Sequence, residues 1–571
     1  MTCWGAVLLT PDRARFRLWA PDRDAITLEI ADAASLAMTA EGDGWFGVEA
    51  PASAGTRYRF RLAPDLVVPD PASRSQMGGV SGWSVIVDHD AYCWRSANWR
   101  GRPWEETIIQ EVHAGALGGF AGVAKSLPAL AELGVTAIEL MPLGAFGGTR
   151  NWGYDGVLLF APAECYGSPD DLKALIDRAH GLGLMVFLDV VYNHFGPDGN
   201  YLDAFAGGFF DPDVHTPWGG AVAVGKRAVH DFFLENALMW LQDYRFDGLR
   251  FDAVHAIPDH AFLDRLAGEI RAAVGPDRHV HLILENETND ADRLAPGRYD
   301  AQWNDDFHNV LHVLLTGETG AYYADFADRP AERLARCLSE GFIYQGEASS
   351  NHDGRARGKP STHLPPTAFV SFLQNHDQIG NRALGERLTR LADGSKLRAA
   401  TALLLLAPQI PLIFMGDESG STSPFLFFTD FHDELADAVR EGRRREFAKF
   451  AAFADPEARE RIPDPNAIKT FEQSRPEPGP DGPEWRALYA KLLALRHAAI
   501  VPRLKHARAI GAQAIGTGAV VARWQMGDGA MLTIAVNLGD AAVEFPDIAI
   551  EPLFALGGAG AAASIAVWVE A

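Results

Sequence analysis

The stretch Phe246-Asp247-Gly248-Leu249-Arg250-Phe251-Asp252 is the most informative segment for the architecture, because it reads as an apolar strand that ends in charged residues. An apolar strand has no packing reason to end in such residues. Parallel strands of a barrel bring their carboxyl ends to one face, where active sites lie. Three other apolar runs end in the same way: Leu184 to Asp189, followed by Tyr192-Asn193-His194; His281 to Glu285; and Phe369 to Leu373, followed by Gln374-Asn375-His376-Asp377.

Around this stretch, apolar runs alternate with segments of helical spacing. A helix is expected from Pro169 to His180, with Ser168 as its N-cap and Asp171 completing a capping box. Repeated strand-then-helix units predict a parallel sheet. Seven runs are clear and an eighth is too polar for a fully buried strand: Ile108–Val112, Val135–Met141, Leu184–Val191, Phe246–Val254, His281–Leu284, Phe369–Leu373 and Ile410–Met415, with Ala301–Phe307 as the eighth.

Periodicity alone leaves an open doubly wound sheet and a closed barrel as alternatives, and the length of the region favours a barrel with insertions. We therefore predict a multidomain α/β chain, with a (β/α)8 barrel over residues 91–500 and an insertion at about 195–229. Short strands separated by Gly, Pro and Asp predict a β-sandwich, similar to carbohydrate-binding modules, over residues 1–90. A β pattern returns over residues 501–571 and predicts a C-terminal β domain.

Composition limits the partners of the chain. The formal charge of −24 repels phosphate backbones and anionic membrane surfaces, so we expect no nucleic acid and no membrane partner. The four cysteines are scattered and form no Cys-x-x-Cys pair, which fits a reducing compartment and indicates no zinc site. The first ten residues lack a basic segment and a long apolar run, and no stretch of about 18 apolar residues occurs, so a cytoplasmic location is expected.

The strand ends would bring four carboxylates, two histidines and an arginine into one bowl. Single Asp or Asn residues after a strand often cap the next helix, but capping does not explain Arg250, or four strands ending alike. Glycoside cleavage needs such a set, because one carboxylate acts as nucleophile or base and a second, protonated one as acid. There is no His-Glu-x-x-His motif, and His279 and His281 lie at a strand start, so we expect no metal or organic cofactor.

Four of these segments resemble the signature regions of the α-amylase superfamily: Asp189 to His194, Gly248 to Asp252, the Glu285 strand and Phe372 to Asp377. The resemblance makes Asp252 the nucleophile, Glu285 the acid/base and Asp377 the transition-state stabiliser. Glu287 faces the same side of its strand and is a rival for the acid. For the substrate-binding residues the resemblance implies the following roles: His194 and His376 on sugar hydroxyls, Tyr154 stacking on the sugar, Arg250 keeping Asp252 ionised, and Asp189 supporting the bowl.

Within the superfamily, the chain most closely resembles the maltooligosyltrehalose trehalohydrolases. Three segments carry this resemblance: Trp152-Gly153-Tyr154-Asp155-Gly156, Pro424 to Asp430 and the basic Gly442 to Phe447. Pro424 to Asp430 has the composition of a sugar-stacking wall, so Phe428 and Asp430 are expected to recognise trehalose, although packing onto the barrel is the alternative. Gly442 to Phe447 is equally compatible with a solvated helix end.

The resemblance implies hydrolysis, with retention of configuration, of the α-1,4 bond next to the terminal trehalose of maltooligosyltrehalose or a related α-glucan oligosaccharide. Trehalose and a maltooligosaccharide would be released. Two alternatives stay open: another activity of the superfamily, such as debranching or branching, and a glycan-binding protein without catalysis. The presence of all three carboxylates disfavours the last of these.

Overall fold

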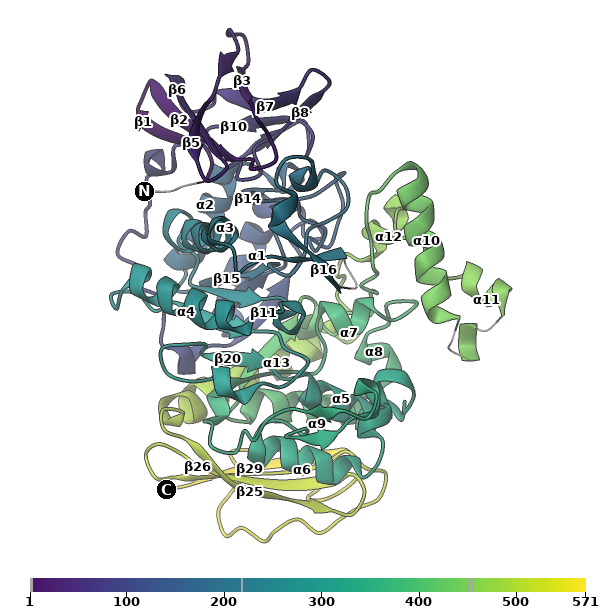
Figure 1. Cartoon of the computed structure of the whole chain (residues 1–571). Coiled ribbons are helices and arrows are strands. Elements are labelled where there is room, and N and C mark those ends of the chain that lie inside the picture. The colour runs from purple at the N-terminus through teal and green to yellow at the C-terminus, as the bar shows by residue number, and fades with distance from the viewer. Residues whose placement is uncertain (1–3, 217–218, 449–450, 454) are drawn as a thin grey trace.

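The structure is a computed structural model, which describes residues 4–216, 219–448, 451–453 and 455–571. Three parts are stacked along the molecule, with the N-terminal sheets, the barrel and the C-terminal sheet in that order (Figure 1). The start of the chain, including Cys3, lies outside the described residues. No helix in the described ranges combines the length and the apolar character that crossing a membrane requires.

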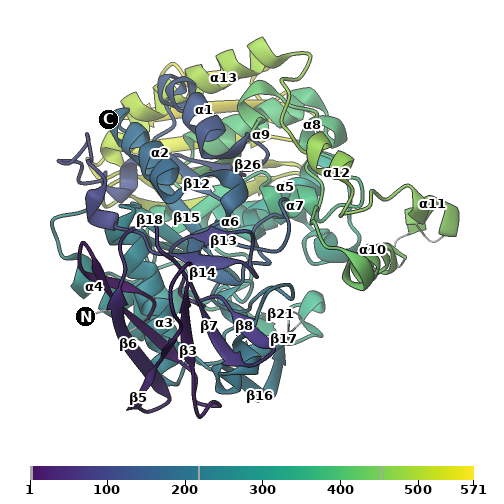
Figure 2. The ribbon, with the colours of Figure 1, turned by 90° about the horizontal axis from the view of Figure 1, so that it is seen from above.

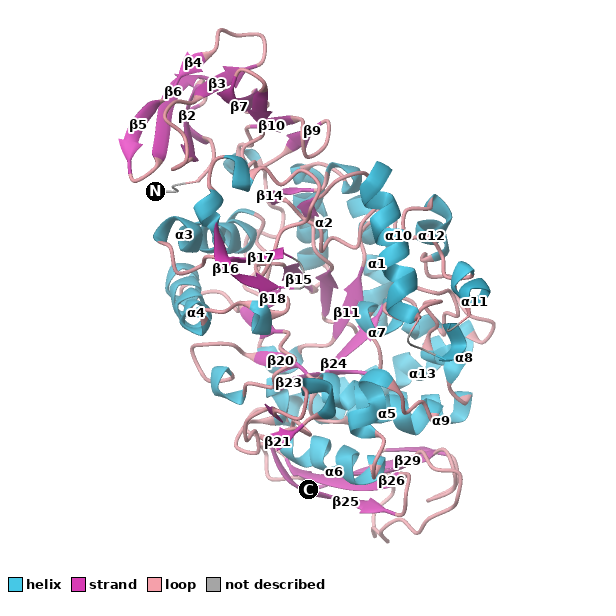
Figure 3. Ribbon diagram, turned by 45° about the vertical axis from the view of Figure 1, so that its right-hand side comes forward, coloured by secondary structure: helices cyan, strands magenta, loops and turns pink. Residues whose placement is uncertain are grey.

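The central part is a closed barrel of eight parallel strands, which confirms the predicted barrel and excludes the open sheet (Figure 3). The polar eighth run is a barrel strand, β20 (Ala301–Trp303). Gly248 begins β18, and a Cβ added there would lie 2.6 Å from the carbonyl oxygen of His281, so only glycine fits this close strand pairing. The eight strands run in barrel order as β11 (Ile109–Val112), β12 (Ala137–Leu140), β15 (Met185–Val190), β18 (Gly248–Phe251), β19 (His281–Leu284), β20, β23 (Phe369–Phe372) and β24 (Ile410–Phe414).

Helices surround the barrel (Figure 3). The helix predicted after Ser168 is α2 (Pro169–Gly181), and its capping box with Asp171 is present. The helix near the end of the barrel region is α13 (Gly482–Leu495), which continues as a π-helical turn to Ile500. The remaining long helices are α1 (Gly119–Leu133), α3 (Arg227–Leu238), α4 (His260–Val274), α5 (Asp305–Thr316), α6 (Pro330–Glu340) and α9 (Gly394–Leu406).

The N-terminal residues form two antiparallel sheets, as the pattern predicted. Trp4 joins them to the barrel, because its indole N–H donates to the carbonyl of Ala228 at 3.0 Å and its ring packs on Phe232. Phe209, within the 195–229 insertion, also packs on Trp4, so part of this insertion has a structural role. The sheets are β1 (Val7–Thr10), β2 (Arg13–Trp19), β6 (Trp45–Pro51) and β5 (Thr39–Gly42), and β4 (Leu36–Ala37), β3 (Thr27–Ile30), β7 (Arg57–Ala63), β10 (Trp83–Val85) and β9 (Gln76–Met77), with β8 (Leu66–Val68) beside β7.

The insertion carries a hairpin of β16 (Phe210–Thr216) and β17 (Gly219–Val222), whose connecting residues 217–218 lie outside the described ranges. The C-terminal residues form the predicted antiparallel sheet, in the order β25 (Arg508–Ile515), β26 (Ala519–Gln525), β27 (Met531–Asn537), β29 (Ser564–Glu570) and β28 (Phe554–Leu556).

One excursion from the barrel is not evident from periodicity. After β24 the chain forms α10 (Asp433–Phe447), α11 (Pro456–Glu460) and α12 (Ile468–Gln473). Figure 2 shows α10 and α11 standing away from the body of the molecule. Only Phe447 of the α10 residues is buried. Because this helix buries so little apolar surface, its sequence lacks the broad apolar stripe by which a helix is predicted.

Candidate active site

Arg250 lies at the centre of the bowl formed at the carboxyl ends of β15, β18 and β19. One of its terminal nitrogens, Nη1, donates to Asp189 Oδ2 at 2.6 Å and to Asp252 Oδ1 at 2.8 Å. The other, Nη2, lies 3.8 Å from Glu285 Oε2. The guanidinium is 4.2 Å from the ring centroid of Trp303, and its side chain is 3% exposed. One buried cation therefore contacts three of the predicted carboxylates.

Glu285 is held where a protonated acid is favoured. Its Oε2 accepts the backbone N–H of Ala253 at 2.6 Å, and Ala253 adopts a left-handed conformation with φ of 40° directly after Asp252. Burial raises the pKa of Glu285 well above its usual range, and the negative charges of Asp252 and Asp305 add to this, whereas Arg250 opposes it. These surroundings favour the protonated form of Glu285, which a general acid requires.

The rival acid, Glu287, lies in different surroundings. Its side chain is 53% exposed, and its carboxylate lies 3.6 Å from His255 Nε2 and 3.5 Å from His352 Nε2. No described contact joins Glu287 to Arg250. The geometry therefore favours Glu285 as the acid.

Asp252 lies next to two donors. Besides Arg250, the amide of Asn193 donates to Asp252 Oδ2 at 3.1 Å. A guanidinium and an amide thus hold one carboxylate in a fixed position, as a nucleophile requires. His194 is close to this pair, because its Nδ1 contacts the side-chain oxygen of Asn193 and its Nε2 lies 2.9 Å from the carbonyl oxygen of Tyr154.

Tyr154 and His376 form a second group in the bowl. Their rings stack with centroids 5.1 Å apart, and the Tyr154 hydroxyl lies 2.9 Å from His376 Nε2 and 2.6 Å from Asp189 Oδ2. His376 also pairs through Nδ1 with the buried carboxylate of Glu111. Burial lowers the pKa of His376, but Glu111 outweighs burial and raises that pKa above its usual range.

Asp377 is the most exposed of the three predicted catalytic carboxylates. Its side chain is 54% exposed, and its Oδ1 lies 4.0 Å from His376 Nε2. The backbone N–H of Asp377 donates to the side chain of Asn375, which caps α7 (His376–Gly380), and the amide of Asn381 donates to Asp377 Oδ1 at 2.8 Å. The short helix α7 thus fixes Asp377 at the edge of the bowl, open to a ligand.

Three acidic residues belong to the site but were not predicted. Glu111 and Glu139 lie side by side on β11 and β12, and neither oxygen of Glu139 has a hydrogen-bond partner in the described part of the chain. Burial raises the pKa of Glu139 well above its usual range, with Asp189 and Glu111 adding to the effect. Burial also raises the pKa of Asp305, the first residue of α5, to about 7. For Glu111 and Glu139, the signal in the sequence that could have revealed them was a charged residue inside an otherwise apolar run.

The structure corrects the expectation for Phe428 and Asp430. The Phe428 ring has 0% exposure and packs against His113 and Phe471, so it offers no surface to a sugar. The Asp430 carboxylate accepts the backbone N–H of Thr149 at 2.7 Å and also pairs with Arg150. Both side chains hold the loop in place, and for Phe428 this is the packing alternative.

The basic segment Gly442 to Phe447 is not merely a solvated helix end. Arg443 is 8% exposed on its side chain and donates to the carbonyl oxygens of Gly380 at 2.6 Å and Arg382 at 3.1 Å. Its guanidinium lies 5.4 Å from the centroid of Phe427. Arg443 thereby ties α10 to the end of α7, the helix that carries Asp377.

Within the described ranges, no group of three or more His, Cys, Asp or Glu residues is arranged to hold a metal ion.

The chain is similar in sequence to known proteins. Residues 75–207 match the family model "Alpha amylase, catalytic domain", and residues 507–568 match a domain of unknown function, DUF3459. The chain is 42% identical over 497 residues to a malto-oligosyltrehalose trehalohydrolase of Deinococcus radiodurans, covering 84% of this chain and 80% of the relative. It is 41% identical over 454 residues to the protein of that name from Saccharolobus solfataricus, covering 77% of this chain and 79% of the relative.

The fold is also similar to that of solved structures, of which two are described. A putative α-amylase from Salmonella typhimurium matches with a TM-score of 0.94 and 45% identity over 100% of both chains. A pullulanase from Anoxybacillus, complexed with maltotetraose, matches with a TM-score of 0.71 and 18% identity, over 100% of this chain and 87% of that one. At this low identity the pullulanase shows the shared fold alone.

Proposed function

Because this chain belongs to the malto-oligosyltrehalose trehalohydrolases, glycoside hydrolases of the α-amylase family that release trehalose, we propose that Asp252 and Glu285 carry out the cleavage. The bond cleaved is the α-1,4 bond next to the terminal trehalose unit of malto-oligosyltrehalose. The products are trehalose and a maltooligosaccharide.

In the first step, Asp252 attacks the anomeric carbon of the glucosyl unit beside trehalose. Glu285 gives its proton to the glycosidic oxygen, so that the bond to trehalose breaks and trehalose leaves with that proton. In the second step, Glu285 takes a proton from water, and the resulting hydroxide displaces Asp252 and restores its carboxylate. Two displacements at one carbon retain the anomeric configuration.

One observation carries this proposal: the two carboxylates lie against the same buried guanidinium, that of Arg250, but in different surroundings. Asp252 receives hydrogen bonds from Arg250 and Asn193, whereas burial and neighbouring negative charges raise the pKa of Glu285. Donors fixed on one carboxylate and a raised pKa on the other indicate that Asp252 is the nucleophile and Glu285 the acid.

The remaining bowl residues would bind and orient the sugar. The Tyr154 ring is only partly buried and is the predicted stacking surface, with His376 behind it. His194, His376 and Asp377 would accept or donate to sugar hydroxyls, and Asp377 would stabilise the positive charge that develops on the ring. Arg250 and Asp189 would fix Asp252 rather than contact the sugar. Phe428 and Asp430 are not included in the substrate-binding set.

Two further parts of the proposal concern organisation and location. We divide the chain into a sandwich at residues 1–90, a catalytic barrel at 91–500 and a C-terminal β domain at 501–571. The described cysteines Cys93, Cys165 and Cys337 are unpaired, which supports a reducing compartment such as the cytoplasm.

The proposed activity is tested by measuring free trehalose from maltotriosyltrehalose and reducing ends from amylopectin with the same enzyme preparation. We expect trehalose release to be by far the faster reaction. An enzyme that acted on amylopectin and released no trehalose would refute the proposal, and an enzyme that bound both glucans and cleaved neither would favour a non-catalytic protein.

A further inference from the structure

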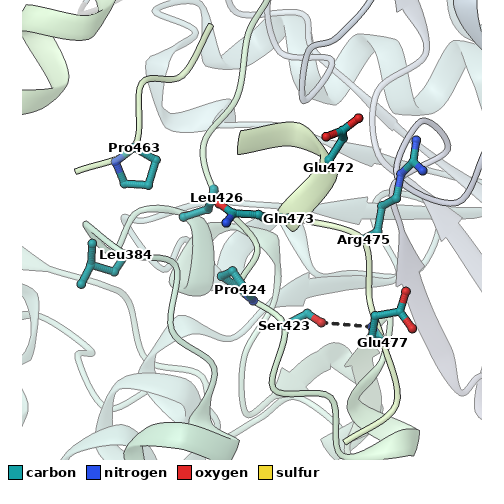
Figure 4. Close-up of a pocket in the computed structure, with 9 residues that line it drawn as sticks. All are labelled: Leu384, Ser423, Pro424, Leu426, Pro463, Glu472, Gln473, Arg475 and Glu477. Carbon is teal, nitrogen blue, oxygen red and sulfur yellow. Dashed lines mark hydrogen bonds between the residues drawn. The ribbon is translucent and has the colours of Figure 1, made fainter. Parts of the chain in front are cut away.

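A hollow of about 500 Å³ opens beside the loop that follows β24, and none of the bowl residues lines it. Ligand sites for small molecules typically have volumes of about 300–1,000 Å³. The loop from Ser423 to Leu426 forms one part of the wall (Figure 4). Residues before and after it complete the wall: Leu384, Pro463, Glu472, Gln473, Arg475 and Glu477. The hollow is large enough for one or two sugar rings.

The two sides of the hollow differ in chemistry. Figure 4 shows Leu384 and Pro463 on one side, and Glu472, Arg475 and Glu477 on the other. No salt bridge of the described residues involves these three charged side chains, although they lie on one short segment. A pyranose ring has an apolar face of C–H groups and an edge of hydroxyls. Carboxylates accept and a guanidinium donates to such hydroxyls, so an amphipathic hollow of this kind matches a sugar.

The wall of the hollow is fixed by contacts that use none of the three charged groups, although the guanidinium of Arg475 lies 5.4 Å from the ring centroid of Phe471. The hydroxyl of Ser423 accepts the backbone N–H of Glu477 at 3.2 Å, and the guanidinium of Arg387 donates to the carbonyl of Ser423 at 2.7 Å. The hydroxyl of Ser474 accepts the backbone N–H of Leu426 at 2.9 Å. Because these contacts already hold the wall in place, less conformational freedom of the protein is lost when a ligand binds.

The same loop also contacts the active site. The indole N–H of Trp152 donates to the carbonyl oxygen of Leu426 at 2.8 Å, while the side chain of Leu426 lines the hollow. The Trp152 ring stacks on Phe425 and meets His376 edge-on, with centroids 5.5 Å apart. The loop from Ser423 to Leu426 therefore lies between the hollow and the bowl.

We propose that this hollow is a second saccharide site, which binds glucosyl units of an α-1,4-glucan chain outside the cleavage site. The inference rests on the proposed function, because that function makes such chains the molecules that the protein handles. Two carboxylates against one guanidinium disfavour a phosphate or another anion and favour a neutral, hydroxyl-rich ligand. The glucan is either the far end of the substrate being cleaved or a separate chain.

Maltotetraose titrated calorimetrically into the Asp252→Asn enzyme tests the proposal. We expect two binding events, of which the one at the hollow is at least about tenfold weaker when Arg475→Ala is added, the scale of one hydrogen bond to a charged group. Leu384→Glu, which places a charge on the apolar side, should have the same effect. Arg13→Ala, which removes an exposed guanidinium from β2, is the matched control and should leave both events unchanged.

A single binding event in Asp252→Asn, or two events unaffected by both hollow variants, would overturn the proposal. The source of the glucan is read from KM with Asp252 intact. If the far end of the substrate occupies the hollow, Arg475→Ala raises KM only for long malto-oligosyltrehaloses; if a separate chain does, KM is unchanged at every length. Failure of wild-type enzyme to release trehalose would refute the proposed function and would leave the calorimetric result to decide the hollow.

Discussion

Replacing Asp430 by alanine is expected to loosen the loop before Trp152 rather than to weaken trehalose recognition selectively. The carboxylate of Asp430 accepts the backbone N–H and the hydroxyl of Thr149 at 2.7 and 2.8 Å, and it pairs with Arg150. Its side chain is only 9% exposed, so these donors would be left in a place that water reaches poorly.

The magnitude follows from the partners that are lost. Each buried polar group left without a partner costs about 1–3 kcal/mol. The Thr149 hydroxyl can rotate to another acceptor, and Arg150 keeps a contact with the carbonyl of Asn466 at 3.2 Å. We therefore expect a total loss of about 3 kcal/mol in the local stability of this loop, dominated by the backbone N–H and the guanidinium.

Amide hydrogen exchange at Thr149 measures this loss directly. A loss of about 3 kcal/mol corresponds to exchange about 100-fold faster if local opening governs it. Glu434→Ala, which removes an exposed carboxylate from the start of α10, is the control and should leave this exchange unchanged. The kcat/KM values for malto-oligosyltrehalose and for plain maltooligosaccharide should fall together. Unchanged exchange together with a tenfold or greater fall in their ratio would show that Asp430 contacts the substrate.

Three other outcomes are expected. Glu285→Gln should lower trehalose release by about three or more orders of magnitude while Glu287→Gln keeps most of it, and the reverse result would assign the acid to Glu287. Because Glu285 must hold its proton, we expect activity to be lost as pH rises through the raised pKa of Glu285. Asp305 has a pKa of about 7, and above that pH its negative charge contributes to the raised pKa of Glu285. Asp305→Asn should therefore lower the pKa of Glu285 and move the alkaline limb of the kcat/KM profile to lower pH, and a shift to higher pH or no shift would contradict this sign. Dialysis against EDTA should leave trehalose release intact, since a carboxylate pair is sufficient for the chemistry; loss of activity that calcium restores would contradict the expectation.

Most of the barrel could be predicted from apolar runs, and its weakest strand shows the limit. The run at β20 contains Gln302, whose polarity argued against a buried strand. In the structure Gln302 is fully buried, and its side-chain amide donates to the carbonyl of Asn286 at 3.0 Å and to the side chain of Asn289 at 3.3 Å. A polar residue can be buried when a distant part of the chain supplies its partners, and periodicity does not show those partners.

The three proposed catalytic carboxylates were predictable because Asp252 and Glu285 directly follow apolar strands, and Asp377 lies in the polar segment after β23. Glu111 and Glu139 were missed because they lie within strands, where the sequence does not show which residues point into the barrel towards Arg250 and His376. The prediction for Phe428 was wrong for a related reason. The composition of Pro424 to Asp430 fits a sugar-binding wall as well as a packed loop, and only the contacts of Phe428 with His113 and Phe471 show that this ring is packed inside.

The central claim is that Asp252 forms a covalent bond to the sugar in a reaction that Glu285 assists. The most direct test is to incubate the enzyme with 5-fluoro-α-glucosyl fluoride and to identify the labelled peptide by mass spectrometry. We expect one 5-fluoroglucosyl unit on Asp252, and accumulation of this species when Glu285→Gln slows its hydrolysis. A label on another residue, or no covalent species while the reagent is consumed, would contradict the assignment of Asp252 as the nucleophile.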